Sequence, residues 1–115
     1  MLNSVKNVEF SNENGMLIAF VKGEVDHHNA SSARRAIDRE LEKIRPAQLA
    51  LDLSAVSFMD SSGLGLILGR YNKAVELGVK FTVRNPTSAT MKIISLAGGE
   101  RIFDVITDHI ENENN

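Results

Sequence analysis

The sequence contains no cysteine, no tryptophan, one tyrosine and two prolines in 115 residues. Without cysteine there is neither a disulfide framework nor a thiolate nucleophile, which favours a reducing compartment. The scarcity of large aromatic residues leaves no platform on which nucleic-acid bases could stack. The 13 basic and 15 acidic residues include no basic cluster of the kind that binds phosphate backbones. We therefore expect a cytoplasmic protein that binds no nucleic acid.

Long apolar runs are also missing. The longest is far shorter than the roughly 20 residues of a membrane-spanning helix, and Met1–Ser4 does not resemble the start of a signal peptide. A chain of 115 residues, 43% hydrophobic and 24% charged, is ordinary for one globular domain with a single core. We expect residues 1–115 to form one domain that does not enter a membrane, with 111–115 as a flexible polar tail.

The hydrophobic pattern predicts an opening hairpin and then alternating helices and strands. Val5–Phe10 and Met16–Val21 are expected to pair, because Asn14 and Gly15 between them both tolerate positive φ. Helices are predicted at 30–44, about 61–77 and 88–97, strands at 49–53, 79–83 and 102–106, and a final turn at 107–110. This order indicates an α/β fold with a mixed, mostly parallel sheet and helices packed against it.

The first predicted helix is amphipathic. Asn29 is its expected N-cap and Pro46 marks its end. The inward residues are Ala33, Ile37, Leu41 and Ile44, and the outward residues are Arg34, Arg35, Asp38, Arg39 and Glu42. We interpret the arginines at positions 34, 35, 39 and 70 as a solvated face, with partner contact as the alternative.

The most informative stretch is Phe58–Gly65, which joins an apolar strand to an apolar helix. It places Asp60, Ser61 and Ser62 where a helix leaves its first N–H groups without partners. Helix capping explains such residues in many proteins. A capping box, however, needs Glu or Gln three residues after the capping serine, and Leu64 and Gly65 occupy those positions.

The second predicted helix carries three glycines, each of which weakens a helix by about 1 kcal/mol relative to alanine. Its expected buried stripe is Leu64, Ile67, Leu68, Tyr71 and Val75, which places Ser62, Leu66, Gly69 and Lys73 outward. We interpret the outward face as a docking surface, kept bare so that a partner can approach closely. Its expected contact residues are Ser62, Gly63, Gly65, Leu66 and Gly69. A phosphate on a hydroxyl at its edge would be favoured by the helix N-terminus.

Motifs for catalysis are incomplete. Gly63–Leu68 lacks the last glycine of a dinucleotide fingerprint, Gly69–Tyr71 lacks the Lys and Ser/Thr of a phosphate loop, and Met59 replaces the first glycine of a nucleophile elbow around Ser61. An enzyme is therefore not expected.

Asp26 and Asp60 each follow a predicted strand, at the sheet edge where ligands and partners bind such folds. Helix capping and partner contact are both open for these two carboxylates. Adjacent His27 and His28 point apart in most backbone conformations and have no cysteine or third histidine nearby. We expect no metal site and no cofactor.

Three features then resemble a known family. Gly23–His28, Leu53 and the long string Phe58–Tyr71 resemble the anti-sigma factor antagonists of the STAS domain family, and among these the sporulation members that act on the anti-sigma-F factor. The resemblance covers nearly the whole chain, and the long string is its specific part. Val25 stands where the family often has leucine, a conservative difference.

The resemblance implies a phosphorylation switch. Ser61 would be the phosphoacceptor, the dimeric anti-sigma-F factor would be the ATP-dependent serine kinase, and a PP2C-type serine phosphatase would reverse the modification. The unphosphorylated form, monomeric when alone, would bind the anti-sigma factor and release the sporulation sigma factor. The residues themselves do not distinguish Ser61 from Ser62. A STAS switch of a stress-response pathway and a small nucleotide-binding or hydrolytic domain are the alternatives.

Overall fold

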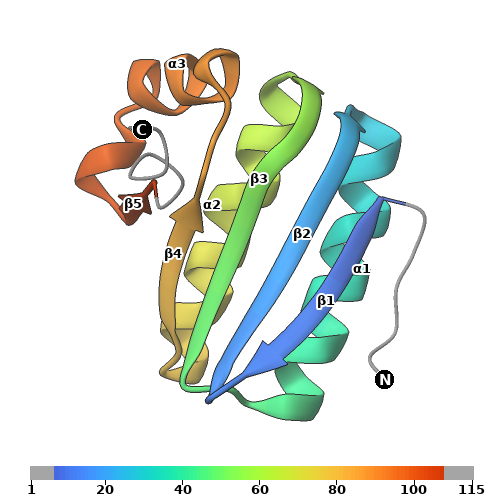
Figure 1. Ribbon diagram of the computed structural model, residues 1–115, viewed down its shortest axis with the longest axis vertical. Helices are drawn as coiled ribbons and strands as arrows, with labels where there is room; N and C mark the ends of the chain where they lie inside the picture. Colours follow the sequence, from blue (N-terminus) through green and yellow to red (C-terminus); the bar gives the residue numbers. More distant parts are fainter. Residues whose placement is uncertain (1–6, 108–115) are drawn as a thin grey trace, which may run out of the picture.

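The structure is a computed structural model that describes residues 7–107. Its elements, in chain order, are β1 (Val8–Glu13), β2 (Met16–Val25), α1 (His27–Ile44), β3 (Gln48–Met59), α2 (Ser61–Leu77), β4 (Lys80–Arg84), α3 (Ser88–Leu96), the 3₁₀ turn η1 (Gly99–Arg101) and β5 (Asp104–Ile106). Within these residues one sheet has the order β1-β2-β3-β4-β5 (Figure 1). Only β1 pairs antiparallel, with β2. The mixed α/β sheet expected from the sequence is confirmed.

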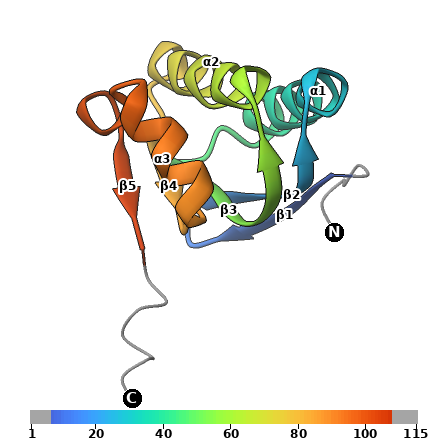
Figure 2. The same cartoon turned by 90° about the horizontal axis from the view of Figure 1, so that it is seen from above.

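Helices α1 and α2 lie side by side on one face of the sheet, and α3 lies beyond the end of β4 (Figures 1 and 2). Because β2, β3 and β4 are parallel neighbours, the helices that connect them run in the same direction. The starts of α1 and α2 therefore meet at the carboxyl ends of β2 and β3. This arrangement brings the two most informative stretches of the sequence together.

The expected hairpin is present. Asn14 and Gly15 have φ of 51° and 83° and form a two-residue loop between β1 and β2. Three predicted segments lie wholly or partly outside the described residues. They are the start of the first predicted strand, the predicted turn at 107–110 except for residue 107, and the tail at 111–115.

Several element boundaries differ from the expected ones. α1 begins at His27 because Asp26, and not Asn29, is its N-cap: the Asp26 carboxylate accepts the N–H of Asn29 at 2.9 Å. β2 and β3 are longer than predicted and reach Val25 and Met59, since their parallel pairing continues past two register shifts in β2. Polar and small residues near these strand ends break the apolar runs from which strands were recognised. β5 is shorter than expected, because the N–H groups of Ile102 and Phe103 donate to the Gly99 carbonyl of η1 and not to a neighbouring strand.

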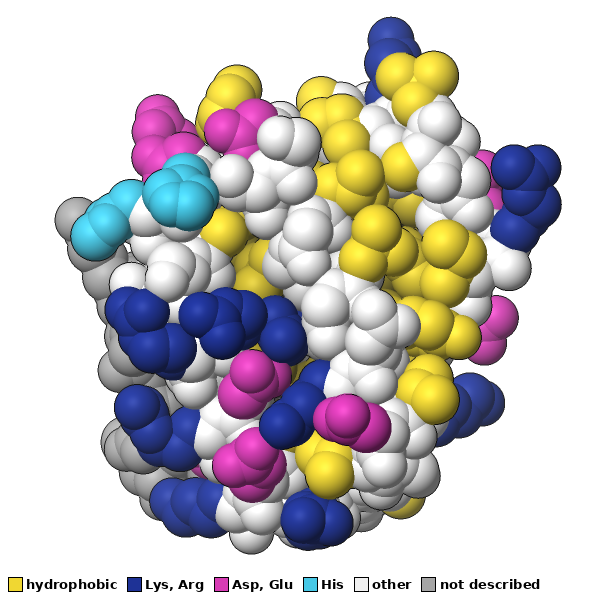
Figure 3. All heavy atoms as spheres, turned by 180° about the vertical axis from the view of Figure 1, so that it is seen from behind, with side chains coloured by type: hydrophobic (Ala, Val, Ile, Leu, Met, Phe, Trp, Pro, Cys, Tyr) yellow, Lys and Arg dark blue, Asp and Glu magenta, His cyan; other side chains and the backbone are white. Residues whose placement is uncertain are grey.

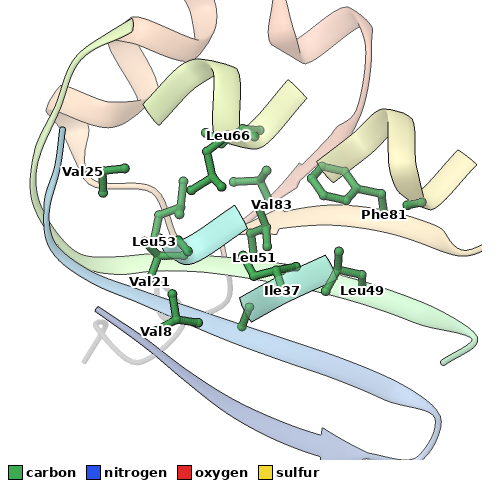
Figure 4. Close-up of a cluster of buried hydrophobic side chains, with 14 of the residues drawn as sticks. Val8, Val21, Val25, Ile37, Leu49, Leu51, Leu53, Leu66, Phe81 and Val83 are labelled. Atoms are coloured by element: carbon green, nitrogen blue, oxygen red, sulfur yellow. The ribbon is translucent and has the colours of Figure 1, made fainter. Parts of the chain in front are cut away.

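The core lies between the sheet and the two helices. Leu49, Leu51 and Leu53 of β3 face Ile37 of α1 and Leu66 of α2 (Figure 4). Leu66 is only 4% exposed, so its expected position on the outward face is wrong. Burying a leucine contributes about 1.5–3 kcal/mol relative to leaving it in water, which makes Leu66 part of what holds α2 on the sheet.

The buried face of α2 is turned by one residue from the predicted one. Its buried residues are Gly63, Leu66, Ile67, Arg70 and Ala74, each one position before a predicted member of the stripe, and of these only Ile67 is itself a predicted member. One residue corresponds to a rotation of about 100°. A stripe drawn through large apolar residues cannot anticipate this, because the face includes glycine, alanine and an arginine whose charge is paired.

The other apolar residues of the predicted stripe lie on the flank of α2 instead. Tyr71 contacts the rings of Phe81 and Phe103, with centroids 5.8 and 6.2 Å away. Val75 is 59% exposed. The rotation also turns Ser62, Leu66 and Lys73 away from open solvent and toward α1.

Candidate functional site

The candidate site lies where β2 and β3 end. Val25 pairs with Met59 in the parallel register, so the residues that follow them, Asp26 and Asp60, sit on neighbouring strands. This confirms that the two carboxylates share one edge of the sheet. Both are N-caps, Asp26 of α1 and Asp60 of α2, which supports the capping interpretation for these two residues.

Asp60 occupies the first turn of α2. Its carboxylate accepts the N–H of Ser62 at 2.8 Å, and its backbone carbonyl accepts the N–H groups of Gly63 and Leu64 at 3.0 and 3.2 Å. Ser61 and Ser62 are thus the first two residues of the helix, not its cap. A phosphate here would compete with the Asp60 carboxylate for the Ser62 N–H, so the helix N-terminus is less free than the sequence suggests.

The two serines lie in different surroundings. Ser61 is exposed, whereas Ser62 is partly buried and faces α1. Neither hydroxyl makes a hydrogen bond within residues 7–107. An enzyme that modifies a hydroxyl can therefore reach Ser61 more easily than Ser62. The sequence alone does not distinguish the two serines in this way.

The glycines of α2 do not share one role. A Cβ on Gly63 would clash with Met59 Cγ and lie 3.1 Å from Met59 Sδ, so Gly63 is required by packing inside the protein. A Cβ on Gly65 or Gly69 would meet no atom within 4 Å. Only these two glycines keep the surface bare, as expected for a docking face.

We expect Gly63→Ala to lower the free energy of unfolding by about 1–3 kcal/mol, because Met59 must move to make room. The matched change Gly65→Ala should raise it by up to about 1 kcal/mol, since alanine favours the helix and clashes with nothing. Urea denaturation of the two variants and the wild type measures both effects. Equal stability of the two variants would contradict the assignment of Gly63 to packing.

A groove of about 250 Å³ separates the first turns of α1 and α2. Its walls are His27, Ala30, Ser31 and Arg34 from α1 and Ser62, Gly65 and Leu66 from α2. Leu66 reaches the surface only as the floor of this groove, so any contact that it makes with a partner must be through the groove. The groove lies next to Ser61 and joins residues that the sequence placed in separate motifs.

Below the groove, α1 and α2 are joined by ion pairs. Arg70 Nε lies 2.8 Å from Asp38, and Lys73 Nζ lies 2.7 Å from Glu42. The Arg70 side chain is only 7% exposed, so its expected place on a solvated face is wrong. Burial lowers the pKa of Arg70, and the negative charge of Asp38 opposes that shift.

The surface around the site is divided by charge and polarity. Figure 3 shows Lys and Arg side chains gathered over α1, and a broad area of hydrophobic side chains over α2 and toward α3. The large exposed hydrophobic residues include Val75 of α2 and, later in the chain, Leu96 and Ile102. The hydrophobic pattern does not predict the exposure of these side chains, because each residue stands in or next to an apolar run that is typical of a buried segment.

The sequence predicts no function for the two adjacent histidines. His27 and His28 are both exposed at the start of α1. Within residues 7–107, no three His, Cys, Asp or Glu side chains are grouped so that they could hold a metal ion. No helix in this part of the chain is long and apolar enough to cross a membrane.

Comparison with known proteins identifies the family. The family model of the STAS domain matches residues 7–113, nearly the whole chain. The chain belongs to the STAS domain family. This STAS domain is 29% identical over 103 residues to the anti-sigma F factor antagonist of Paenibacillus polymyxa, covering 90% of this chain and 88% of the relative. It is 28% identical over 94 residues to the anti-sigma-B factor antagonist of Bacillus subtilis, covering 82% and 84%.

Solved structures support the fold of this STAS domain. The anti-sigma factor antagonist SpoIIAA in its unphosphorylated form matches with a TM-score of 0.75 at 22% identity, over 92% of this chain and 93% of that one. The phosphorylated form of the Bacillus cell fate determinant SpoIIAA matches with a TM-score of 0.69. This STAS domain is accordingly of the anti-sigma factor antagonist type, a regulatory protein and not an enzyme.

Proposed function

We propose that this STAS domain antagonises an anti-sigma-F factor and is switched off by phosphorylation of Ser61. In the unphosphorylated state it binds the anti-sigma factor in the cytoplasm and releases the sporulation sigma factor. The anti-sigma factor, a dimeric serine kinase, transfers phosphate from ATP to Ser61 and so ends the interaction. A PP2C-type serine phosphatase restores the binding form.

The observation that carries this proposal is the exposed hydroxyl of Ser61 at the start of α2, beside the partly buried Ser62. A kinase must bring a γ-phosphate in line with the hydroxyl that it modifies, and only an accessible side chain permits that approach. The relatives named for sigma F and the long string Phe58–Tyr71 support the choice of partner.

The contact surface in this proposal is the edge formed by Asp26, Asp60, Ser62, Gly65 and Gly69. Leu66 and Gly63, two expected contact residues, are buried, so their role is to shape this edge from below. A partner that fits against bare glycines beside a small hydroxyl has no room for a phosphate, which adds about −1.5 to −2 charges.

The test is incubation of the protein with purified anti-sigma-F factor and ATP, followed by intact mass and peptide mapping. We expect one phosphate on the wild type and on Ser62→Ala, and none on Ser61→Ala. A phosphate that persists in Ser61→Ala would exclude Ser61 as the acceptor.

The second candidate is a partner switch of another pathway, and the relative named for sigma B favours it. The same assay with a sigma-B-type anti-sigma factor separates the two candidates. If only the sigma-B-type anti-sigma factor phosphorylates the protein, the protein acts in the stress-response pathway, and the proposed role of Ser61 is unchanged.

A further inference from the structure

Charged residues join α1 and α2 at successive turns. Glu42 pairs with Lys73 at 2.7 Å, and one turn earlier Asp38 pairs with Arg70 at 2.8 Å. Another turn earlier, Arg34 occupies the same line of α1, because residues four apart lie on one helix face. Opposite Arg34, however, the groove offers Gly65 and Leu66, which carry no charge.

Among the described residues, Arg34 has no carboxylate to pair with. None of the ion pairs formed within residues 7–107 includes it. The nearby guanidinium of Arg70 is positive as well: after burial and the opposing effect of Asp38, the charge of Arg34 further lowers the pKa of Arg70. At this end of the helix pair, the described residues thus show one paired carboxylate, that of Asp38, beside the two guanidinium groups of Arg34 and Arg70.

A second observation concerns the donors of Arg70. Nη1 of Arg70 is buried and has no hydrogen-bond partner among the described residues. A buried donor without a partner costs free energy, and a donor that belongs to a charged group costs more. Arg34 and Arg70 thus both belong to the interface between α1 and α2, and of the two only Arg34 lines the groove.

We propose that the groove between the starts of α1 and α2 receives an acidic side chain, Asp or Glu, of the anti-sigma factor, whose carboxylate pairs with Arg34. This inference rests on the proposed function, because it names what the partner brings to the same site. Arginine binds carboxylates through two parallel N–H donors, which gives direction as well as attraction. Gly65 leaves the approach open, and Leu66 supplies an apolar floor for the carbon atoms of the incoming side chain.

The pairing also connects recognition to the switch. Ser61 lies one helical turn before Gly65 and directly before Ser62, and both of these residues line the groove. A phosphate on Ser61 adds negative charge there and repels the carboxylate that the groove receives. The same side chain of the partner is therefore attracted by Arg34 in one state and repelled by phosphoserine in the other.

The test compares Arg34→Glu with Arg39→Glu. Both replace an exposed arginine of α1 by glutamate, but only Arg34 lines the groove. We expect Arg34→Glu to weaken binding of the unphosphorylated protein to the purified anti-sigma factor by about tenfold or more, and Arg39→Glu by about twofold or less. Arg34→Gln, which removes the charge without reversing it, should fall between them. Circular dichroism checks that each variant is folded.

The outcomes separate the two proposals. If Arg34→Glu and Arg39→Glu weaken binding equally, the groove pairing is wrong while the proposed function stands. If Arg34→Glu leaves this affinity unchanged but raises the pKa of phosphoserine in ³¹P NMR, Arg34 serves the phosphate and not the partner, which also overturns the inference. If the wild type binds neither an anti-sigma-F nor an anti-sigma-B factor, the proposed function fails and the inference fails with it.

Discussion

Phosphorylation of Ser61 is expected to weaken binding to the anti-sigma factor by about a hundredfold or more. Placing like charges against each other in an interface costs several kcal/mol, and each 1.4 kcal/mol corresponds to a factor of ten. At Ser61 the phosphate lies beside the Asp60 carboxylate, which already accepts the Ser62 N–H. The added charge is therefore only partly compensated within the protein and acts on the partner.

Isothermal titration of the fully phosphorylated and unphosphorylated proteins measures this effect, with kinase-treated Ser61→Ala as the control that should keep the affinity of its untreated form. Because Ser61 is exposed, its phosphate displaces no buried side chain. Amide chemical shifts should accordingly change around the start of α2 and remain unchanged in β1 and β5. Large changes in those distant strands would show that the switch works by refolding and not by a local block.

Leu66→Ala is expected to lower the free energy of unfolding by about 2–5 kcal/mol, the usual cost of removing a buried leucine and leaving a cavity. Leu66 is 4% exposed and packs with the central residues of β3 and α1 (Figure 4). The effect would be large for a protein of this size, whose total stability is typically about 5–15 kcal/mol. An exposed leucine, as expected from the sequence pattern, would change stability by only about 0.5 kcal/mol.

Leu96→Ala is the matched control, because Leu96 is 83% exposed near the end of α3. Urea denaturation of both variants should show a change of only about 0.5 kcal/mol for Leu96→Ala. A stability loss for Leu66→Ala as small as that of the control would contradict the burial of Leu66. It would support the position of Leu66 on the outward docking surface that the sequence pattern predicts.

The elements themselves were predictable because local chemistry specifies them. Asn14 and Gly15 can both adopt positive φ, so they turn the hairpin without strain. Gly78 ends α2 at φ 73°, as its position after the last apolar turn indicates. Alternation of helices and strands then implies parallel pairing, and with it the meeting of Asp26 and Asp60 at one edge.

The facing of α2 was not predictable in the same way. A hydrophobic stripe assigns the core to large apolar residues, but a helix packs where its partners allow. Gly63 is buried because Met59 fills the space beside it, and Arg70 is buried because Asp38 of another helix pairs with it. Asp38 is far from Arg70 in the sequence. Met59 is close to Gly63, but the direction of its side chain depends on the end of β3.

The α/β fold and the hairpin follow from the sequence alone, which also predicts the stretch Asp60–Gly65 as the candidate site, since turn, cap and periodicity are local properties. The accessibility of each serine, the facing of α2, and the position of Arg34 opposite Gly65 with no carboxylate partner among the described residues are known only from the tertiary structure. Those facts depend on the distance and rotation between α1 and α2, which are set by packing both helices on one sheet and not by either helix alone.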